Sequence, residues 1–484
     1  MTQEHYDWGN DYKVRGHLQA AQQASSAGDA VLLDSEGMIP NAFIHGGHWT
    51  YGLAFDQSVL YDTSGGSIAS DPAACLTYTR DCTNFVPVTN TSDIIDVGSW
   101  SISRNAMLKD CFYATFKLED SVWQPYEKLN PANLAQVIAT WNTEGYWEDA
   151  TGASHNTTHD TMFCIPKRSV QRNANGIMMS SDPSFGDLSA FKYGNRTAGQ
   201  EWDYLCIGVY DTSYVDSVPM SVSGQAPAHS HTRNSFRSDV TTMKGGNWHL
   251  WNWHEYALYR DMALFCMKNF DSQRALGHGV VSGGQNGKKN SGLADAYGPF
   301  YGVTANDTTT VKCLIENPWG NVWQFVDDVY LGPGETETVE EGGTSVTHYY
   351  QGVYVGTNAA SSVDCHVSTG KTKILDKWYM STPSGTNMDC QIKPIVLATG
   401  QHSWSLNGAP IDAGADNKGL CDNNWRSYHT EEPSSDTASS PRGRNFLVGG
   451  YSGYGLALGL FTVYASDPLS SSHWGVGARL AFTF

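Results

Sequence analysis

The chain has 484 residues, and 49 acidic against 30 basic side chains give it a formal net charge of −19. This length allows two or three domains with a sizeable core. Because no Lys/Arg cluster is dense enough to follow a phosphate backbone, nucleic acid and anionic membranes are not expected partners. No apolar run reaches the length of a membrane span, so membrane insertion is not expected.

The residue types favour a β-rich protein with aromatic contact surfaces. Gly (49), Trp (16) and Tyr (25) are plentiful and only 16% of residues are charged. The N-terminus lacks a basic segment followed by an apolar core, which predicts a protein made in a cytoplasm. The ten cysteines are never spaced as Cys-x-x-Cys, and we expect most to be reduced and buried. Disulfides or a metal site are the alternatives, although zinc needs more closely paired ligands.

The first half of the sequence predicts an irregular arm over residues 1–60 and a mixed α+β domain over 61–220. The arm serves for attachment or oligomerisation, or it packs on its own subunit. Short apolar segments between turn clusters, such as residues 111–118 and 162–166, predict strands. A helix is predicted where Asn130 is a possible N-cap and Pro131 follows it. Apolar residues continue that pattern at the spacing of one buried helix face: Leu134, Val137, Ile138 and Trp141.

Two pairs of histidines are weak candidates for metal binding. His155 and His159 precede Asp160, but the surrounding residues are typical of a solvated loop. His229 and His231 lie in a Pro/Ala/Ser-rich stretch. We predict no metal at either pair.

Residues 221–484 form the third predicted domain. Asn252, followed three residues later by Glu255, is a capping-box pattern that predicts a helix to about Asn269. The Gly/Ser/Asn-rich residues 271–310 lack the order of a phosphate-binding loop and are predicted to be a surface loop.

Four motifs occur in one order along this domain. They are Gly246-Asn-Trp-His-Leu-Trp-Asn-Trp-His-Glu-Tyr-Ala-Leu258, Glu316-Asn-Pro-Trp-Gly-Asn-Val-Trp-Gln-Phe-Val-Asp327, Val448-Gly-Gly-Tyr451 and Trp474-Gly-Val-Gly-Ala-Arg-Leu-Ala481. In these motifs and their spacing the chain resembles the formylglycine-generating-enzyme-like branch of the C-type lectin fold, over about residues 225–484. Within that branch it is most similar to phage tail adhesins and to the variable proteins of diversity-generating retroelements.

The resemblance implies an α+β fold in which a C-type-lectin-like domain follows a β-rich N-terminal region. It implies a scaffold role for Trp319, Trp323 and Phe325, which would fill a small core. The enzymes of the branch use a late pair of cysteines to bind copper, but no cysteine here follows Cys421, so oxidase activity is not expected. Asp327 and Asp328 could hold calcium as in some relatives, although paired acids at a strand end are usually solvated. We predict no cofactor.

Residues 455–464 alternate as a strand with two apolar faces. By the resemblance, Gly459 and Phe461 match core positions. The face with Leu458, Leu460, Thr462 and Tyr464 would then point outward or toward a neighbouring subunit, and a fully buried central strand is the alternative for Leu456–Leu460. Side chains in and around this strand form the predicted ligand-binding surface: Tyr451, Ser452, Tyr454, Leu458, Thr462, Tyr464, Ser466, Asp467, Ser471, His473 and Trp474.

These features predict a non-catalytic phage virion protein, a tail fibre, adhesin or spike that binds a receptor on the bacterial surface. The receptor could be a saccharide or a protein. The resemblance implies other virion proteins as partners and a homo-oligomer, with a trimer by analogy only. A purely structural virion spike or decoration protein is the alternative, and an oxidase of the formylglycine-generating type is a third, weaker hypothesis.

Overall fold

The structure is a computed structural model. It describes residues 48–56, 73–74, 76–173, 176–192, 201–356, 371–380, 388–389, 425–426, 428–429 and 444–484, apart from 454, 456–457, 465–466 and 468. Within these residues the chain is rich in β-strands and has three α-helices, so its fold is α+β in the broad sense.

The largest sheet joins the two halves of the sequence. It has eight strands in the order β15-β28-β12-β9-β5-β6-β7-β8, all antiparallel to their neighbours. Its strands are β5 (Phe112–Glu119), β6 (Val122–Asn130), β7 (Asn133–Trp141), β8 (Trp147–Asp149), β9 (Asp160–Pro166), β12 (Tyr204–Gly208), β15 (Trp248–Leu250) and β28 (Leu480–Thr483). Because the C-terminal strand β28 pairs with β12, the sheet crosses the domain boundary predicted at residues 220 and 221. The predicted boundary therefore does not separate two cores, because residues from both sides of it form one sheet.

The helix predicted after Asn130 is also wrong, because residues 133–141 form strand β7. The Asn130 side chain does accept a backbone N–H, that of Ala132, but at 3.0 Å this bond closes the turn between β6 and β7. Leu134 and Val137 are buried as predicted. Their three-residue spacing suits this strand because the register with β6 shifts at Leu129.

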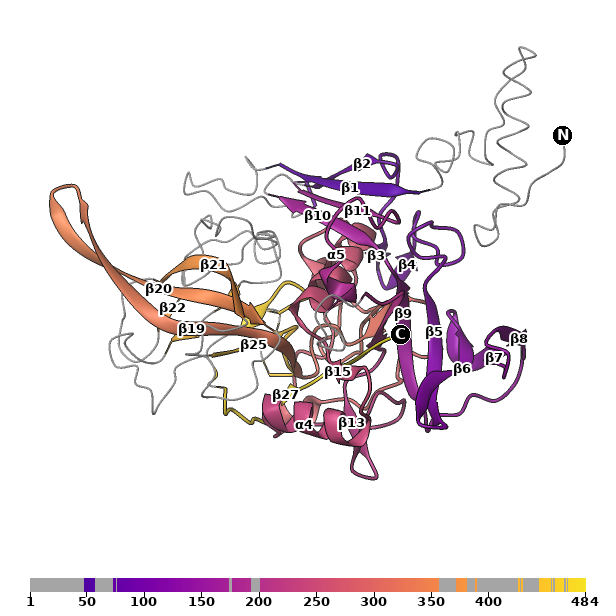
Figure 1. Cartoon of the computed structure of the whole chain (residues 1–484). Coiled ribbons are helices and arrows are strands. Elements are labelled where there is room, and N and C mark those ends of the chain that lie inside the picture. The colour runs from indigo at the N-terminus through magenta and orange to yellow at the C-terminus, as the bar shows by residue number, and fades with distance from the viewer. Residues whose placement is uncertain are drawn as a thin grey trace, which may run out of the picture.

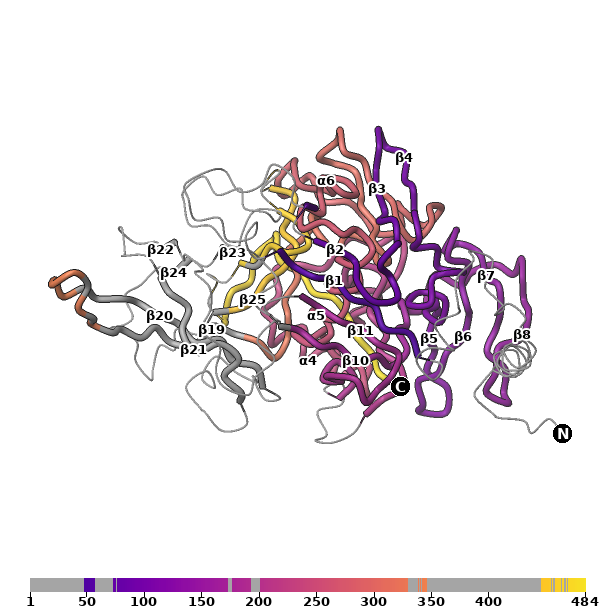
Figure 2. The backbone as a smooth tube through the Cα atoms, turned by 90° about the horizontal axis from the view of Figure 1, so that it is seen from above, coloured from indigo at the N-terminus to yellow at the C-terminus, as the bar shows by residue number. Residues whose placement is uncertain are grey.

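A second, four-stranded sheet includes part of the predicted N-terminal arm. Its order is β10-β11-β1-β2, with β1 (Thr50–Phe55), β2 (Leu76–Arg80), β10 (Ser169–Asn173) and β11 (Gly176–Ser180). Both views show it lying over helix α5 (Trp253–Met267) (Figures 1 and 2). The Tyr78 hydroxyl donates to the carbonyl of Phe265 across this contact. Residues 50–55 are thus part of the folded body, while the rest of the arm before residue 48 lies outside the described residues.

Helix α5 begins with the predicted capping box. The Asn252 side chain accepts the N–H groups of His254 and Glu255, and the Glu255 carboxylate accepts the N–H of Asn252 at 2.9 Å. In the structure every residue of α5 except His254 is buried, which is typical of a helix enclosed between two layers.

The third large sheet leaves the body of the molecule. Its order is β21-β20-β19-β25-β26-β23, and β27 pairs in parallel with the start of β19. The β19–β20 hairpin extends away from the other elements (Figure 1). Its strands are β19 (Trp323–Glu341), β20 (Thr344–Gly356), β21 (Lys371–Met380), β23 (Trp425–Arg426), β25 (Arg444–Val448), β26 (Val463–Tyr464) and β27 (Val476–Gly477).

The remaining elements are short, apart from α4 (Arg233–Met243). They are β3 (Thr89–Thr91), β4 (Ile94–Asp96), η1 (Ser189–Phe191), β13 (Ser213–Val215), β14 (Val218–Met220), α6 (Ser272–Ala275), η2 (Gly284–Gly287), β16 (Phe300–Tyr301), β17 (Lys312–Cys313), β18 (Ile315–Glu316), β22 (Met388–Asp389) and β24 (Tyr428–His429). Residues 271–310, predicted as a surface loop, thus include α6, η2 and β16, and Val280 and Val281 among them are fully buried.

Six of the ten cysteines lie in the described part of the chain. Cys82, Cys111, Cys266 and Cys313 are free and buried, as predicted. Cys164 and Cys206 form a disulfide, which corrects the prediction for this pair. They stand directly opposite each other on the neighbouring antiparallel strands β9 and β12, a relation that the sequence spacing of 42 residues did not indicate.

The capping box gives a test of how far α5 stabilises the fold. We expect Asn252→Ala to lower the free energy of unfolding by about 1–2 kcal/mol, because two backbone N–H groups lose their acceptor. Asn252→Ser keeps an oxygen at the cap and should lose less. Urea unfolding measures both, with Asn286→Ala on the exposed surface as a control. Equal stability of the Ala and Ser variants would contradict the capping role.

Candidate binding site

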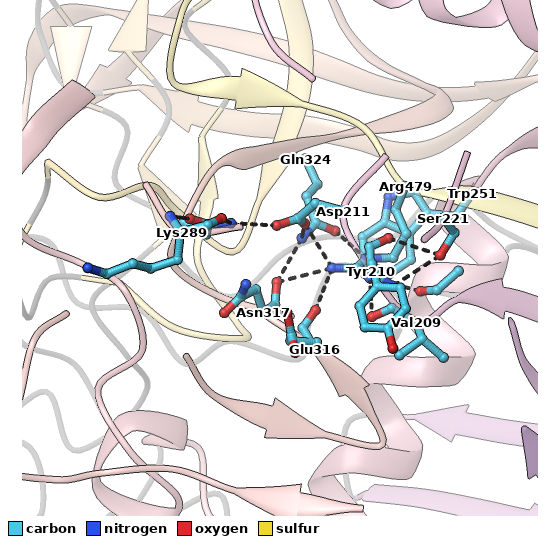
Figure 3. Close-up of polar contacts among 12 residues, drawn as sticks. Val209, Tyr210, Asp211, Ser221, Trp251, Lys289, Glu316, Asn317, Gln324 and Arg479 are labelled. Carbon is cyan, nitrogen blue, oxygen red and sulfur yellow. Dashed lines mark hydrogen bonds and ion pairs between the residues drawn. The ribbon is translucent and has the colours of Figure 1, made fainter. Parts of the chain in front are cut away.

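The site is built on a buried arginine at the start of the C-terminal strand. Arg479 is fully buried, and its Nε donates to Gln324 Oε1 at 2.8 Å while one terminal nitrogen donates to Asp211 Oδ1 at 3.0 Å (Figure 3). Its other hydrogen bonds go to main-chain carbonyls 2.8–3.1 Å away, those of Gly208, Val209, Glu316 and Asn317. The guanidinium also lies 5.5 Å from the centroid of the Trp251 ring. One side chain therefore joins three separate segments of the chain.

Asp211 is the buried counter-charge, and two side chains of the Trp-Gly-Asn-Val-Trp-Gln-Phe motif share it. Gln324 Nε2 donates to one carboxylate oxygen and Asn321 Nδ2 donates to the other, each at 2.9 Å. Burial raises the pKa of Asp211 to about 6, although Arg479 acts in the opposite direction. The ion pair therefore depends on these neutral donors as well as on Arg479.

The same motif fills the core with its aromatic residues. Trp319, Trp323 and Phe325 are buried, which confirms the predicted packing role. The structural role of Asn321 and Gln324 was not predicted. Two amide side chains inside an apolar run were the available signal, because a buried amide needs hydrogen-bond partners.

The hydrogen bonds around Arg479 and Asp211, which we call the buried network, extend through Asn321 to the turns that carry several predicted binding residues. Asn321 Oδ1 accepts the N–H of Lys289 at 2.8 Å, and the Asn321 carbonyl accepts the N–H of Ser452 at 3.2 Å. Two more backbone bonds fix this region: Gly320 N–H to Gly449 O at 3.0 Å, and Trp323 N–H to Gly475 O at 2.8 Å. Backbone hydrogen bonds therefore attach the turns at residues 449–453 and 473–475 to residues 320–323, beside the buried Arg479 and Asp211.

Four side chains on and beside these turns form what we call the terminal aromatic cluster: Tyr451, Tyr464, His473 and Trp474. The Tyr451 and Trp474 rings meet edge to face, with centroids 5.1 Å apart, and Tyr464 stacks on Trp323 at 5.4 Å. His473 is exposed and the other three are half-buried. The cluster thus presents aromatic surface to solvent from a fixed backbone.

Two glycines let the Tyr451 ring lie against the main chain. A Cβ atom at Gly475 would be 2.7 Å from Tyr451 Cδ2, and one at Gly453 would be 2.8 Å from Tyr451 Cε2. Both distances are too short for a carbon–carbon contact. The ring position therefore depends on the absence of side chains at 453 and 475.

Three residues predicted to bind ligand are instead enclosed by the chain itself. Leu458 and Ser452 are fully buried and Thr462 is 2% exposed. Ser452 has a structural role, since its hydroxyl donates to the Gly284 carbonyl at 2.7 Å. These residues cannot contact a ligand on the surface of this chain.

Of the predicted strand over residues 455–464, only β26 at Val463–Tyr464 is a strand within the described residues, and residues 456 and 457 lie outside them. Residues 458–462 are not a strand, and all five are buried, including Leu460, which was predicted to face outward. Alternate residues point to opposite faces only in a strand. In this segment side chains of successive residues can face the same core, so the alternation of residue types does not predict which of them are exposed. The buried alternative for Leu458–Leu460 therefore describes their environment, although not their backbone.

The remaining predicted site residues divide into two groups. Asp467 and Ser471 are half-buried, and the Ser471 hydroxyl donates to Asp467 Oδ2 at 3.2 Å. Tyr454 and Ser466 lie outside the described residues. The structure therefore brings together four of the predicted residues, those of the terminal aromatic cluster.

The acidic residues considered for metal binding have protein partners. Asp327 is buried in a two-pronged ion pair with Arg237 of α4, and is not solvated. Asp160 is buried against Lys244. No group of three or more His, Cys, Asp or Glu side chains suited to a metal occurs in the described part of the chain.

The two histidine pairs also have protein contacts. His155 Nδ1 lies 2.9 Å from Glu127 and the His159 ring lies 4.9 Å from that of Tyr126, so residues 155–159 are more enclosed than the predicted solvated loop. His231 stacks on Tyr214 with centroids 4.9 Å apart. His229 Nδ1 is 2.9 Å from the Ser230 hydroxyl.

Comparisons with known proteins add no family to this geometry: no family model matches the sequence, and no curated protein matches it. Among the described helices, none is long and apolar enough to cross a membrane.

Removing Arg479 tests whether the network supports the site. We expect Arg479→Met to lower the free energy of unfolding by about 3–5 kcal/mol, because Asp211 would remain buried without its counter-charge. Urea unfolding measures the loss. Arg104→Met, on an exposed side chain, should change stability by less than about 0.5 kcal/mol. Similar values for the two variants would contradict the central role of Arg479.

Proposed function

We propose that this protein is a non-catalytic receptor-binding protein of a phage virion, a tail adhesin or spike. Its C-terminal half would have a C-type-lectin-like fold of the formylglycine-generating-enzyme-like branch. The terminal aromatic cluster would contact a receptor on the bacterial surface. The rest of the chain would hold the protein to other virion proteins and to sister subunits, in a homo-oligomer such as a trimer.

One observation carries this proposal. Large aromatic side chains are partly exposed on and beside turns whose backbone is hydrogen-bonded to residues 320–323. Leaving Tyr451, Tyr464 and Trp474 partly in water costs free energy, which a ligand that covers them would recover. Aromatic rings have few rotatable bonds, so little conformational entropy is lost on binding. A rigid aromatic surface is therefore suited to recognition.

The fold assignment has separate support. The aromatic residues of the Trp-Gly-Asn-Val-Trp-Gln-Phe motif lie in the core, and the arginine of the terminal Gly-Ala-Arg-Leu-Ala run contacts Gln324 of that motif. Two of the four motifs that carry the resemblance thus meet in space. This arrangement agrees with a shared scaffold role for them.

A structural virion spike or decoration protein is the second candidate. The observation that favours it is the projecting β19–β20 hairpin, since a hairpin that leaves the body gains stability from contact with another subunit (Figure 1). Position in the particle separates the two functions. In an adhesin the terminal aromatic cluster is accessible to labelled antibody on intact virions, and in a purely structural protein it is covered.

The binding role is tested on the cluster itself. We expect Tyr451→Ala and Trp474→Ala each to weaken binding of the purified protein to cells of the host bacterium by roughly tenfold or more, because hot-spot aromatic residues contribute about 2 kcal/mol or more. Labelled protein and flow cytometry give the affinity. Tyr146→Ala, at a ring exposed on another turn, is the matched control. Unchanged binding of both cluster variants, with thermal unfolding unaltered, would remove the site assignment.

A more conservative change tests the position of the Tyr451 ring. Gly475→Ala adds one methyl group, which must displace the ring because its Cβ would lie 2.7 Å from Tyr451 Cδ2. We expect weaker cell binding with the aromatic side chains all present. Gly298→Ala, where no atom lies within 4 Å of the added carbon, should bind as the unaltered protein does. Equal affinity of the two variants would show that the ring position is unimportant.

Diversification of the site by a retroelement is part of the same proposal, and the flanking DNA tests it. A near-copy of the last coding stretch that differs at adenines, next to a reverse-transcriptase gene, would support it.

A further inference from the structure

A positively charged side chain, Lys288, lies beside the terminal aromatic cluster of this acidic chain. The formal net charge is −19, and several lysines lie beside carboxylates. Lys117 is 2.7 Å from Glu119, and Lys167 is 3.1 Å from Asp203. An anionic ligand would be repelled by most of this molecule.

Lys288 lies beside the terminal aromatic cluster and, within the described residues, contacts no carboxylate. Its Nζ donates to the carbonyl of Trp474 at 3.0 Å and lies 5.7 Å from the centroid of that ring. An ammonium group has three N–H donors, so two remain for another partner. Lys288 is half-buried, which lowers the pKa of its ammonium group, and it lies beside the half-buried ring of Trp474.

The neighbouring histidines add donors and no negative charge. Burial and the nearby Lys288 and His231 lower the pKa of His229, which favours the neutral imidazole with its one N–H donor. His473 Nδ1 accepts the N–H of Gly475 at 3.1 Å, which places the ring proton on Nε2. The surroundings of Trp474 thus offer one cation and several N–H donors.

We infer that the terminal aromatic cluster binds a glycan that carries a carboxylate or phosphate group, with Lys288 contacting the anion. The inference rests on the proposed function and names the ligand class of that site. The ammonium group supplies a charge-assisted hydrogen bond. The faces of Tyr451 and Trp474 supply flat apolar surface against which the C–H faces of a sugar ring can pack.

An acidic peptide fits this surface less well. Extended peptides bind by adding a strand to a sheet edge, where a run of backbone groups holds them. Next to the cluster, β26 and β27 have two residues each. β27 is also paired with β19 already. The described backbone here offers no long edge for a peptide, whereas ring stacking needs none.

The test uses the whole protein and cells of the host bacterium. Cells are first treated with proteinase K, and then one portion is amidated with carbodiimide and ethanolamine, which neutralises carboxylates. A second portion is treated with hydrofluoric acid, which cleaves phosphodiesters. We expect binding to survive the protease and to fall at least about tenfold after one of the two chemical treatments, which identifies the anion.

Variants connect the anion to Lys288. Lys288→Gln should weaken binding to untreated cells at least about tenfold and lower its sensitivity to salt between 50 and 500 mM NaCl. Lys109→Gln removes the same charge from an exposed position and should have no such effect. On amidated or hydrofluoric-acid-treated cells, whichever had lost binding, Lys288→Gln and the unaltered protein should bind equally.

The possible failures are distinct. If Trp474→Ala weakens binding but Lys288→Gln and both chemical treatments do not, the ligand is neutral and the inference is wrong while the proposed function stands. If proteinase K alone abolishes binding, the ligand is a protein and the inference is again wrong. If neither Trp474→Ala nor Tyr451→Ala affects binding, the proposed site fails, and the inference fails with it.

Discussion

The structure depends on one buried positive charge, the guanidinium of Arg479, which needs hydrogen-bond partners and a counter-charge in the interior. A guanidinium without water must find a partner for each N–H group, and those partners come from two distant segments of the chain, residues 208–211 and 316–324. Asp211 supplies the opposite charge, and Gln324 bonds to both members of the pair. This requirement fixes how the C-terminal strand, β12 and the start of β19 lie relative to one another (Figure 3).

The same constraint explains why the surface turns near the C-terminus are well supported. Asn321 contacts Asp211 with its amide nitrogen, and holds Lys289 and Ser452 with its two oxygens. Asn321 therefore links the buried ion pair by hydrogen bonds to the backbone next to Tyr451. Glycines at 453 and 475 then allow the ring to lie against that backbone. The surface turns are thus held in place by the same hydrogen bonds that pair the buried polar groups of the core.

Other charges of this acidic chain are used in a similar way. Arg237 and Asp327 form a buried pair that joins α4 to β19, and Lys244 and Asp160 form another between the end of α4 and β9. Lys288 has no carboxylate among its described partners, which are the ring and the carbonyl of Trp474. A cation beside the terminal aromatic cluster is available to a ligand, and the ligand class inferred above follows from that position.

The sequence by itself determined the features that depend on near neighbours. The capping box at Asn252 and Glu255 was predictable because its two hydrogen bonds join residues three apart. The burial of Trp319, Trp323 and Phe325 was predictable because large aromatic side chains in an apolar run seldom remain in water. The cluster of Tyr451, His473 and Trp474 was also expected, from the resemblance and from its residue types.

Only the tertiary structure decided the features that depend on distant partners. Residues 133–141 form a strand because β6 offers an edge to pair with, which outweighs their helical spacing. Cys164 meets Cys206 because β9 and β12 are neighbours in the sheet. Leu458 and Thr462 are buried because their segment folds inward and does not follow the alternation of a strand. Hydrogen bonds and packing between residues far apart in sequence set these outcomes, and local sequence patterns carry no information about which distant segments will meet.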